Sequence, residues 1–224
     1  MNLFLALGYK EWMKTRRILG ISALAFCMML AYTFVEISHA IRLEEAVNVW
    51  YAYIFQLASV APLWKWLPSL VGLLVALSQF VPEMTNKRLK LTLHLPVSET
   101  VILVDMLLYG LGSLLLLFFL AGGVLACGAG YFLPAEVVSL MLWQILPWTV
   151  SGLVVYGFTV WVCMEPQWKQ RILNTFVALS GLSVFFLSDT PRGYMYFGWG
   201  MAGILLLSFL FSLYSCVRFK DGVQ

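Results

Sequence analysis

Long apolar runs alternate with short polar connections along the whole chain. Most of these runs approach or exceed the roughly 20 residues that a helix needs to cross a hydrocarbon core about 30 Å thick. Together they predict an all-α, polytopic membrane protein with six transmembrane helices. The third run is longer than a span requires, and the fifth is short. The runs are residues 18–39, 62–81, 101–131, 138–163, 172–188 and 194–217.

The composition supports the same class of protein. Hydrophobic residues make up 62% of the 224 residues and charged residues only 11%, and the mean hydropathy is +0.88. Soluble domains are about half apolar and about one quarter charged, so this composition excludes an ordinary soluble enzyme. Because the apolar runs occupy most of the chain, we expect residues 1–224 to form a single transmembrane domain.

The positions of lysine and arginine predict which side of the membrane each connection faces. Eleven of the fourteen lie before the first run, between the second and third, between the fourth and fifth, or after the sixth. Cytoplasmic connections are enriched in these residues, so we expect both termini in the cytoplasm and the chain in the inner (plasma) membrane. The net charge of +3 then belongs to a rim that faces anionic lipid, and we expect no binding to nucleic acid.

The first 17 residues combine apolar side chains with a cluster of cations. Leu7 and Trp12 are apolar, whereas Lys10, Lys14 and Arg17 are basic. This makeup is typical of a helix that lies in the membrane interface. We therefore predict an interfacial elbow helix over residues 1–17, ahead of the first span. The alternative is that these residues are the first turns of a longer span.

Small residues recur at four-residue spacing in the third run, at Gly122, Ala126 and Gly130. This spacing lets two membrane helices approach closely. The pattern predicts a helix–helix interface there, either within one subunit or between two subunits.

Residues that carry catalytic chemistry are few. His39 and His94 are expected on opposite sides of the membrane, so they cannot share a metal ion or a haem. The chain has no glycine-rich phosphate loop and no metalloprotease motif. We therefore expect no enzymatic activity and no cofactor in this chain. The carboxyl groups of Glu83 and Asp105 flank the basic residues 87–90, and we expect a local network of salt bridges among them.

The segment between the second and third runs is the longest polar interruption inside the apolar part of the chain. Pro82 and Glu83 end the second run, basic residues follow at 87, 88 and 90, and leucine occupies every second position from 89 to 95. We interpret the segment as a short amphipathic helix followed by a break at Pro96, because a lone strand at a membrane surface leaves its backbone unpaired. Such a segment offers apolar side chains to a soluble partner.

This segment resembles the permease subunits of ATP-binding-cassette exporters of the second type, which have the type V exporter fold. The family pattern F-x-x-E, a basic leucine-rich run and Leu-Pro-x-Ser corresponds here to Phe80, Glu83, residues 87–95 and residues 95–98. The resemblance implies that residues 82–100 form the coupling loop, which docks onto a cytoplasmic ATPase. The implied docking residues are Leu91, Leu93, Leu95 and Pro96, with Glu83 and Arg88 as charged contacts to the partner or to the elbow helix.

The resemblance also implies the other components of the transporter. Two copies of the ATPase subunit would bind ATP and Mg²⁺, and a second permease, identical or similar, would complete the pathway. The first, second and fifth spans would line a half-channel for the substrate. Two features depart from the family pattern: residues 189–193 are a short outer connector, and Glu99 stands where a basic residue often follows Leu-Pro-x-Ser.

Two other functions fit parts of the pattern. A non-transporting scaffold or assembly factor would use the 82–100 loop to dock a soluble partner without ATP-driven motion. A secondary carrier would need carboxylates near the middle of the membrane or broken helices at matching positions of two halves. Apart from Pro147 in the fourth run, the chain shows neither of these features.

Overall fold

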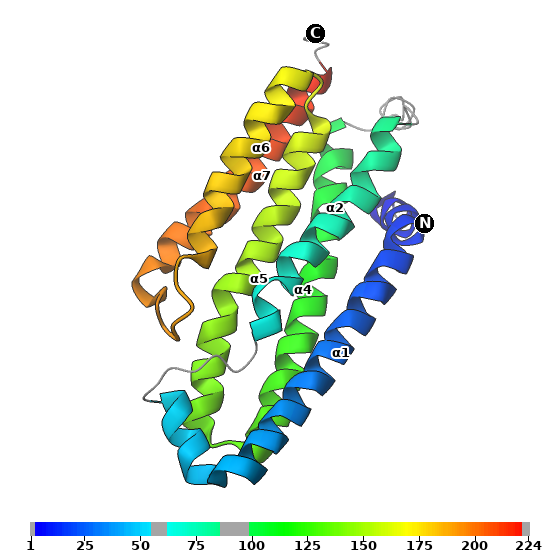
Figure 1. Ribbon diagram of the computed structural model, residues 1–224. Helices are drawn as coiled ribbons and strands as arrows, with labels where there is room; N and C mark the ends of the chain where they lie inside the picture. The colour runs from blue at the N-terminus through cyan, green and yellow to red at the C-terminus, as the bar shows by residue number, and fades with distance from the viewer. Residues whose placement is uncertain (1–2, 55–61, 86–98, 221–224) are drawn as a thin grey trace.

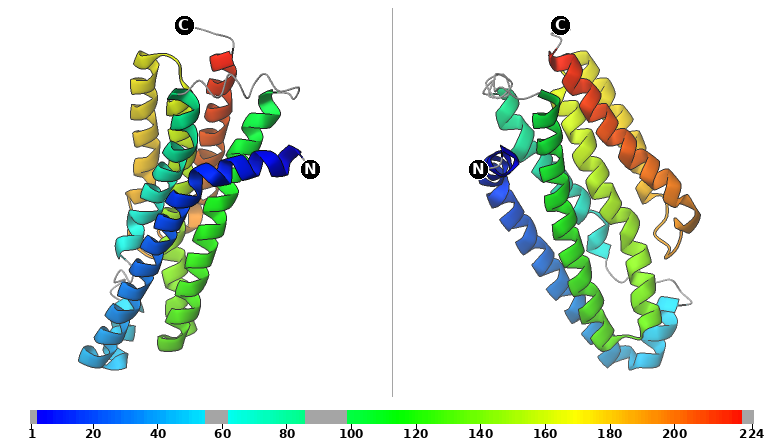
Figure 2. Two further views of the ribbon diagram at one scale, coloured as in Figure 1. Left: turned by 90° about the vertical axis from the view of Figure 1, so that its right-hand side faces the viewer. Right: turned by 180° about the vertical axis from the view of Figure 1, so that it is seen from behind.

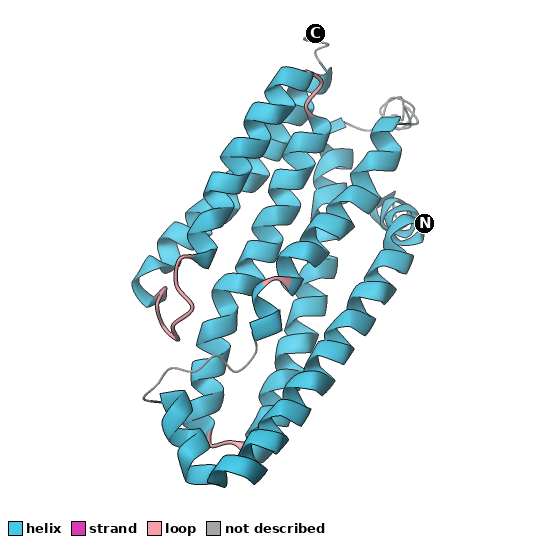
Figure 3. Ribbon diagram, in the orientation of Figure 1, coloured by secondary structure: helices cyan, strands magenta, loops and turns pink. Residues whose placement is uncertain are grey.

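The protein is a bundle of helices in a computed structural model (Figure 1). The structure describes residues 3–54, 62–85 and 99–220, and these contain helices and loops but no strand (Figure 3). The elements are α1 (Leu3–Ile54), η1 (Pro62–Lys65), α2 (Leu67–Thr85), α4 (Glu99–Phe132), α5 (Ala135–Met164), α6 (Trp168–Ser183), η2 (Val184–Phe186), η3 (Met195–Phe197) and α7 (Gly198–Lys220).

Within the described residues, five helical segments are long and apolar enough to cross a membrane: Ala6–Leu43, Pro62–Met84, Val101–Phe132, Ala135–Met164 and Met195–Ser215. The prediction of an all-α protein with membrane-spanning helices is confirmed to that extent. The fifth expected run falls largely in α6, which has 16 residues. A helix of that length is about 24 Å long, shorter than a hydrocarbon core of about 30 Å. The short 3₁₀ turn η2 continues it.

Helix α5 is the centre of the bundle and packs against α2, α4, α6 and α7 (Figure 1). Glycines allow its closest contacts. A Cβ atom added at Gly72 of α2 would lie 2.0 Å from the carbonyl oxygen of Gly152 in α5. A Cβ atom added at Gly157 would lie 2.5 Å from the hydroxyl oxygen of Ser208 in α7. Only residues without a side chain permit such an approach, so these positions set the spacing of α5 from its neighbours.

Two of the small residues singled out on α4 make no close contact with another helix among the described residues. A Cβ atom added at Gly122 or Gly130 has nothing within 4 Å. The close approach on α4 is at Gly128, where an added Cβ would lie 2.3 Å from the ring of Phe34 in α1. The contact with α1 therefore uses a different face of α4 from the one that the four-residue spacing marks.

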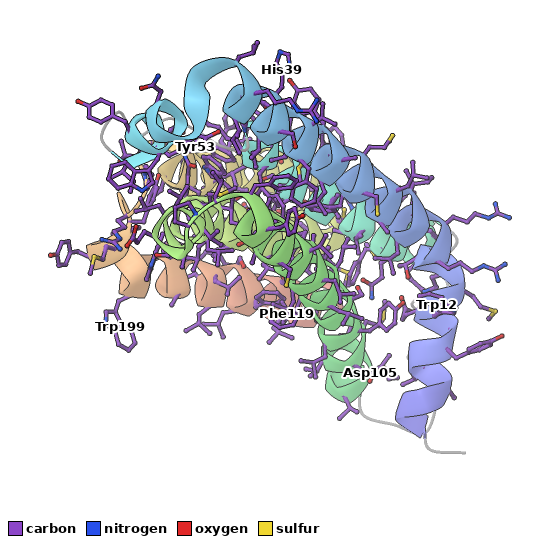
Figure 4. The ribbon with its side chains drawn as sticks, turned by 90° about the horizontal axis from the view of Figure 1, so that it is seen from below. Trp12, His39, Tyr53, Asp105, Phe119 and Trp199 are labelled. Atoms are coloured by element: carbon purple, nitrogen blue, oxygen red, sulfur yellow. The ribbon has the colours of Figure 1, made fainter. Side chains whose placement is uncertain are left out.

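The expected elbow segment is continuous with the first span. Helix α1 begins at Leu3 and has no break, because no proline or glycine lies between residues 9 and 19. Its first turns nevertheless bend away from the rest and cross the bundle, passing the start of α4 (Figures 2 and 4). The hydroxyl of Thr15 donates to the carbonyl oxygen of Glu11, 3.0 Å away, and such bonds often bend helices. The first 17 residues are thus the start of a longer helix and lie at an angle to its remainder, and their placement in the membrane interface stays a prediction.

At the opposite end, η1 is held to the connector between α6 and α7. The ammonium of Lys65 lies 2.7 Å from the carboxylate of Asp189, and the amide of Gln144 donates to the Asp189 carbonyl oxygen at 2.8 Å. The rings of Trp66 and Phe186 stack with their centroids 4.7 Å apart. These contacts join η1 and the start of α2 to α5 and to the segment that follows α6.

Candidate functional site

A cluster of charged groups joins the N-terminal turns of α1 to the last turns of α2. Lys10 and Lys14 both contact one carboxylate oxygen of Glu83, Lys10 at 3.0 Å. Lys14 also contacts the carboxylate of Glu11 at 2.7 Å. We name Lys10, Glu11, Lys14 and Glu83 the α1–α2 charge cluster. It lies at the end of the bundle where α2, α5 and α7 finish, which we call the basic end (Figure 1).

The α1–α2 charge cluster is balanced in charge and increasingly buried toward Glu83. Side-chain exposure falls from 33% at Lys10 to 14% at Lys14 and 0% at Glu83. Removing a carboxylate from water costs several kcal/mol unless a cation pairs with it. Two ammonium groups face two carboxylates here, so each charge has an opposite neighbour. The pairing holds α1 and α2 in one relative position at the basic end.

The same segment of α1 also contacts α4. The hydroxyls of Thr15 and Tyr109 lie 3.0 Å apart, and Thr15 is fully buried. Glu11 and Thr15 are one helical turn apart, so both face the bundle from the same side of α1. Helix α1 thus holds the end of α2 through Lys10 and Lys14, and an early turn of α4 through Thr15. These are the helices between which residues 86–98 lie.

A second set of polar contacts lies one turn deeper and involves α5. The Gln79 amide donates to the Met106 carbonyl oxygen at 2.7 Å, and the Tyr156 hydroxyl donates to the Gln79 amide oxygen at 2.9 Å. Gly110 leaves room for both, because a Cβ atom there would lie 2.0 Å from the Tyr156 hydroxyl. Buried hydrogen bonds of Gln79 thus join its own helix, α2, to both α4 and α5. Buried polar groups need such partners, because they are removed from water.

Replacing Tyr156 with phenylalanine is expected to lower the free energy of unfolding by about 1–2 kcal/mol. The substitution leaves the buried amide oxygen of Gln79 without its donor, and an unsatisfied buried acceptor costs about that much. Thermal or denaturant unfolding in detergent micelles measures the change. Tyr196→Phe is the control, because Tyr196 is 96% exposed and should shift stability by less than about 0.5 kcal/mol. Equal effects for the two variants would contradict the importance of this hydrogen bond.

The structure describes only one of the proposed docking residues, Glu83, which contacts α1. Arg88, Leu91, Leu93, Leu95 and Pro96 lie outside the described residues, as does the basic group at 87–90. The carboxylate oxygen Oδ2 of Asp105 is buried and has no hydrogen-bond partner among the described residues. Sequence reasoning missed Glu11, Gln79 and Tyr156. The sequence did contain a signal for an ion pair of Glu11. Glu11 is an acidic residue in a basic segment, and at a spacing of three residues it shares a helix face with Lys14.

The charge cluster joins the first turns of α1 to the end of α2 through ion pairs. No group of three or more metal-binding side chains occurs in the part of the chain that the structure describes. No protein-family model, curated protein or solved structure matches the chain. The features that bear on function are therefore the contacts among α1, α2 and α4 and the sequence of residues 86–98, which connects α2 to α4.

Proposed function

We propose that the chain is the transmembrane permease subunit of an ATP-driven transporter, an exporter of the ATP-binding-cassette class. The observation that carries this proposal is the α1–α2 charge cluster at the end of α2, which residues 86–98 follow in the sequence. The end of α2 leads into that segment, the start of α4 leads out of it, and α1 contacts both. A force applied to the segment therefore reaches three helices together. A coupling loop of a transporter requires such a connection.

In this proposal a cytoplasmic ATPase subunit docks on residues 82–100 through Leu91, Leu93, Leu95 and Pro96. Two copies of the ATPase bind ATP and Mg²⁺, and a second permease completes the assembly. Closure of the ATPase pair pushes on the loop, and Glu83 transmits the displacement to Lys10 and Lys14 of α1. Both termini and the loop face the cytoplasm, and the three expected channel-lining helices are α1, α2 and α6.

The alternative is a membrane scaffold that docks a soluble protein through the same loop. The same contacts favour it, because helices that are held together on both sides of the loop also suit a docking platform. The two functions differ in one observable. A permease must alter the ATP turnover of its partner, whereas a scaffold binds its partner without doing so.

The test is a pull-down of the full chain from detergent-solubilised membranes. We expect an ATPase subunit to copurify with the wild type and to be lost when Leu91 and Leu95 are both replaced with aspartate, because a charge cannot enter an apolar cleft. Leu43→Asp is the matched control, since Leu43 is 70% exposed at the opposite end of the bundle. It should retain the ATPase.

Two results would contradict the permease. If no ATPase copurifies with the wild type, the transport proposal fails. If a soluble partner copurifies but its ATP turnover is the same with and without the chain, the scaffold replaces the permease as the proposed function.

A further inference from the structure

An apolar groove lies along the membrane-facing side of α2, α5 and α6. Its volume is about 320 Å³, at the lower end of the range for ligand sites. The groove lies within the helices that are long and apolar enough to span the membrane, or beside them on α6. The residues that matter here are Leu77, Phe158, Thr159, Cys163, Thr175 and Leu179.

The lining of the groove restricts what can lie in it. Apart from two threonine hydroxyls and the thiol of Cys163, the lining is hydrocarbon, and it contains no charged side chain. A charged group inside it would lose its water and gain no partner. The part of a ligand that enters the groove must therefore be an uncharged, apolar chain.

A cation lies at the end of the groove nearest the basic end. Arg171 is one turn before Thr175 on the same side of α6, so it continues the groove-facing side of that helix. Its guanidinium donates to the carbonyl oxygens of Glu165 and Cys163, the second at 3.4 Å. Cys163 itself lines the groove, so the guanidinium lies at the mouth.

The guanidinium of Arg171 retains donors for a ligand. It carries five N–H groups, and the two bonds to α5 use two of them. The flat fork of N–H groups matches two oxygens of a phosphate or a carboxylate. An anionic group at the mouth and an apolar chain in the groove are thus accommodated by adjacent parts of one surface.

We propose that the groove binds an anionic phospholipid from the leaflet at the basic end. The phosphate lies on Arg171 and one acyl chain lies between α2 and α6 on the surface of α5. A second apolar groove between α4 and α5, of about 470 Å³, serves as the comparison, because its lining is also hydrocarbon apart from the hydroxyl of Thr149. The binding is a property of this chain alone and stands or falls independently of ATP-driven transport.

Native mass spectrometry of the full chain in detergent tests the proposal. The delipidated wild type is titrated with phosphatidylglycerol and, separately, with diacylglycerol of the same acyl chains, which lacks the phosphate. We expect phosphatidylglycerol to bind about tenfold more tightly. A tenfold difference in affinity corresponds to about 1.4 kcal/mol, which is about the contribution of one charge-assisted hydrogen bond. Arg171→Gln should remove this preference.

A matched pair of substitutions locates the lipid without touching Arg171. Leu179→Trp narrows the groove between α2 and α6, and Leu146→Trp makes the same change in the groove between α4 and α5. Both leucines are partly exposed, so both variants should fold. We expect about tenfold weaker binding of phosphatidylglycerol for Leu179→Trp and wild-type binding for Leu146→Trp.

Three results would overturn the proposal. Diacylglycerol that binds as tightly as phosphatidylglycerol would remove the role of the cation. Wild-type lipid binding by Leu179→Trp would show that the acyl chain lies elsewhere. Equal losses for Leu179→Trp and Leu146→Trp would show that lipid coats the whole apolar surface without a specific site.

Discussion

Replacing Glu83 with glutamine is expected to lower the free energy of unfolding by about 3 kcal/mol and to release the first turns of α1 from the bundle. Removing one partner of a buried ion pair typically costs about 3–5 kcal/mol, and the partial exposure of Lys10 places this case at the lower end. The variant leaves two ammonium groups beside the single carboxylate of Glu11. Their repulsion acts on the segment that carries them.

Two measurements separate these effects. Unfolding in detergent micelles reports the loss of stability, and limited trypsin digestion reports release of α1, because Arg16 and Arg17 become available for cleavage once the helix unwinds locally. Glu36→Gln is the matched control. Glu36 is an exposed glutamate of α1, and no ion pair with it occurs among the described residues, so its substitution should change stability by less than about 0.5 kcal/mol. Unchanged stability and digestion in Glu83→Gln would show that the charge cluster does not hold α1.

Replacing Gly72 with valine is expected to cost at least about 3 kcal/mol. The first added carbon would lie 2.0 Å from the Gly152 carbonyl oxygen and 3.0 Å from its carbonyl carbon. Because both atoms belong to the backbone of α5, no side-chain rotation relieves the overlap, and α2 and α5 must move apart. Overpacking that shifts backbone costs about 1–3 kcal/mol or more.

A glycine in open surroundings provides the opposite result. Gly112 lies in α4 and an added Cβ atom there has nothing within 4 Å. Gly112→Ala should therefore stabilise the protein by up to about 1 kcal/mol, since alanine is the better helix former. Unfolding of the two variants in the same detergent compares them directly. If Gly72→Val and Gly112→Ala changed the free energy of unfolding in the same direction, the close contact of α2 with α5 would not be a determinant of the fold.

The membrane-spanning helices are predictable from sequence because each signal is local. The expected runs 62–81 and 101–131 correspond to the spans Pro62–Met84 and Val101–Phe132. A continuous stretch of apolar side chains identifies such a helix without reference to any other part of the chain. The first 17 residues show the limit of this approach. Their basic residues marked an end of the span, but helix α1 continues through them because its hydrogen bonds need no apolar side chains.

The partners of the polar residues were not predictable, because they are distant in sequence. Glu83 was identified as a charged contact to the partner or to the elbow helix, and the structure shows its contact with Lys14, 69 positions away. Tyr156 contacts Gln79 across 77 positions. Hydrophobic periodicity indicates which side of a helix is apolar and is silent about which helix faces it. The assignment of Glu83 and the other residues to docking of an ATPase stays a prediction.

The separation of Lys14 from Glu83 has a consequence for how the protein is made. Ribosomes synthesise α1 first, and Glu83 appears only when α2 is complete. Until then Lys14 has Glu11 beside it on the same helix, whereas the carboxylate that joins both lysines does not yet exist. We expect the N-terminal turns of the nascent chain to stay undocked, and to dock only after the second helix has entered the membrane. The α1–α2 charge cluster can thus form only after both helices have been synthesised.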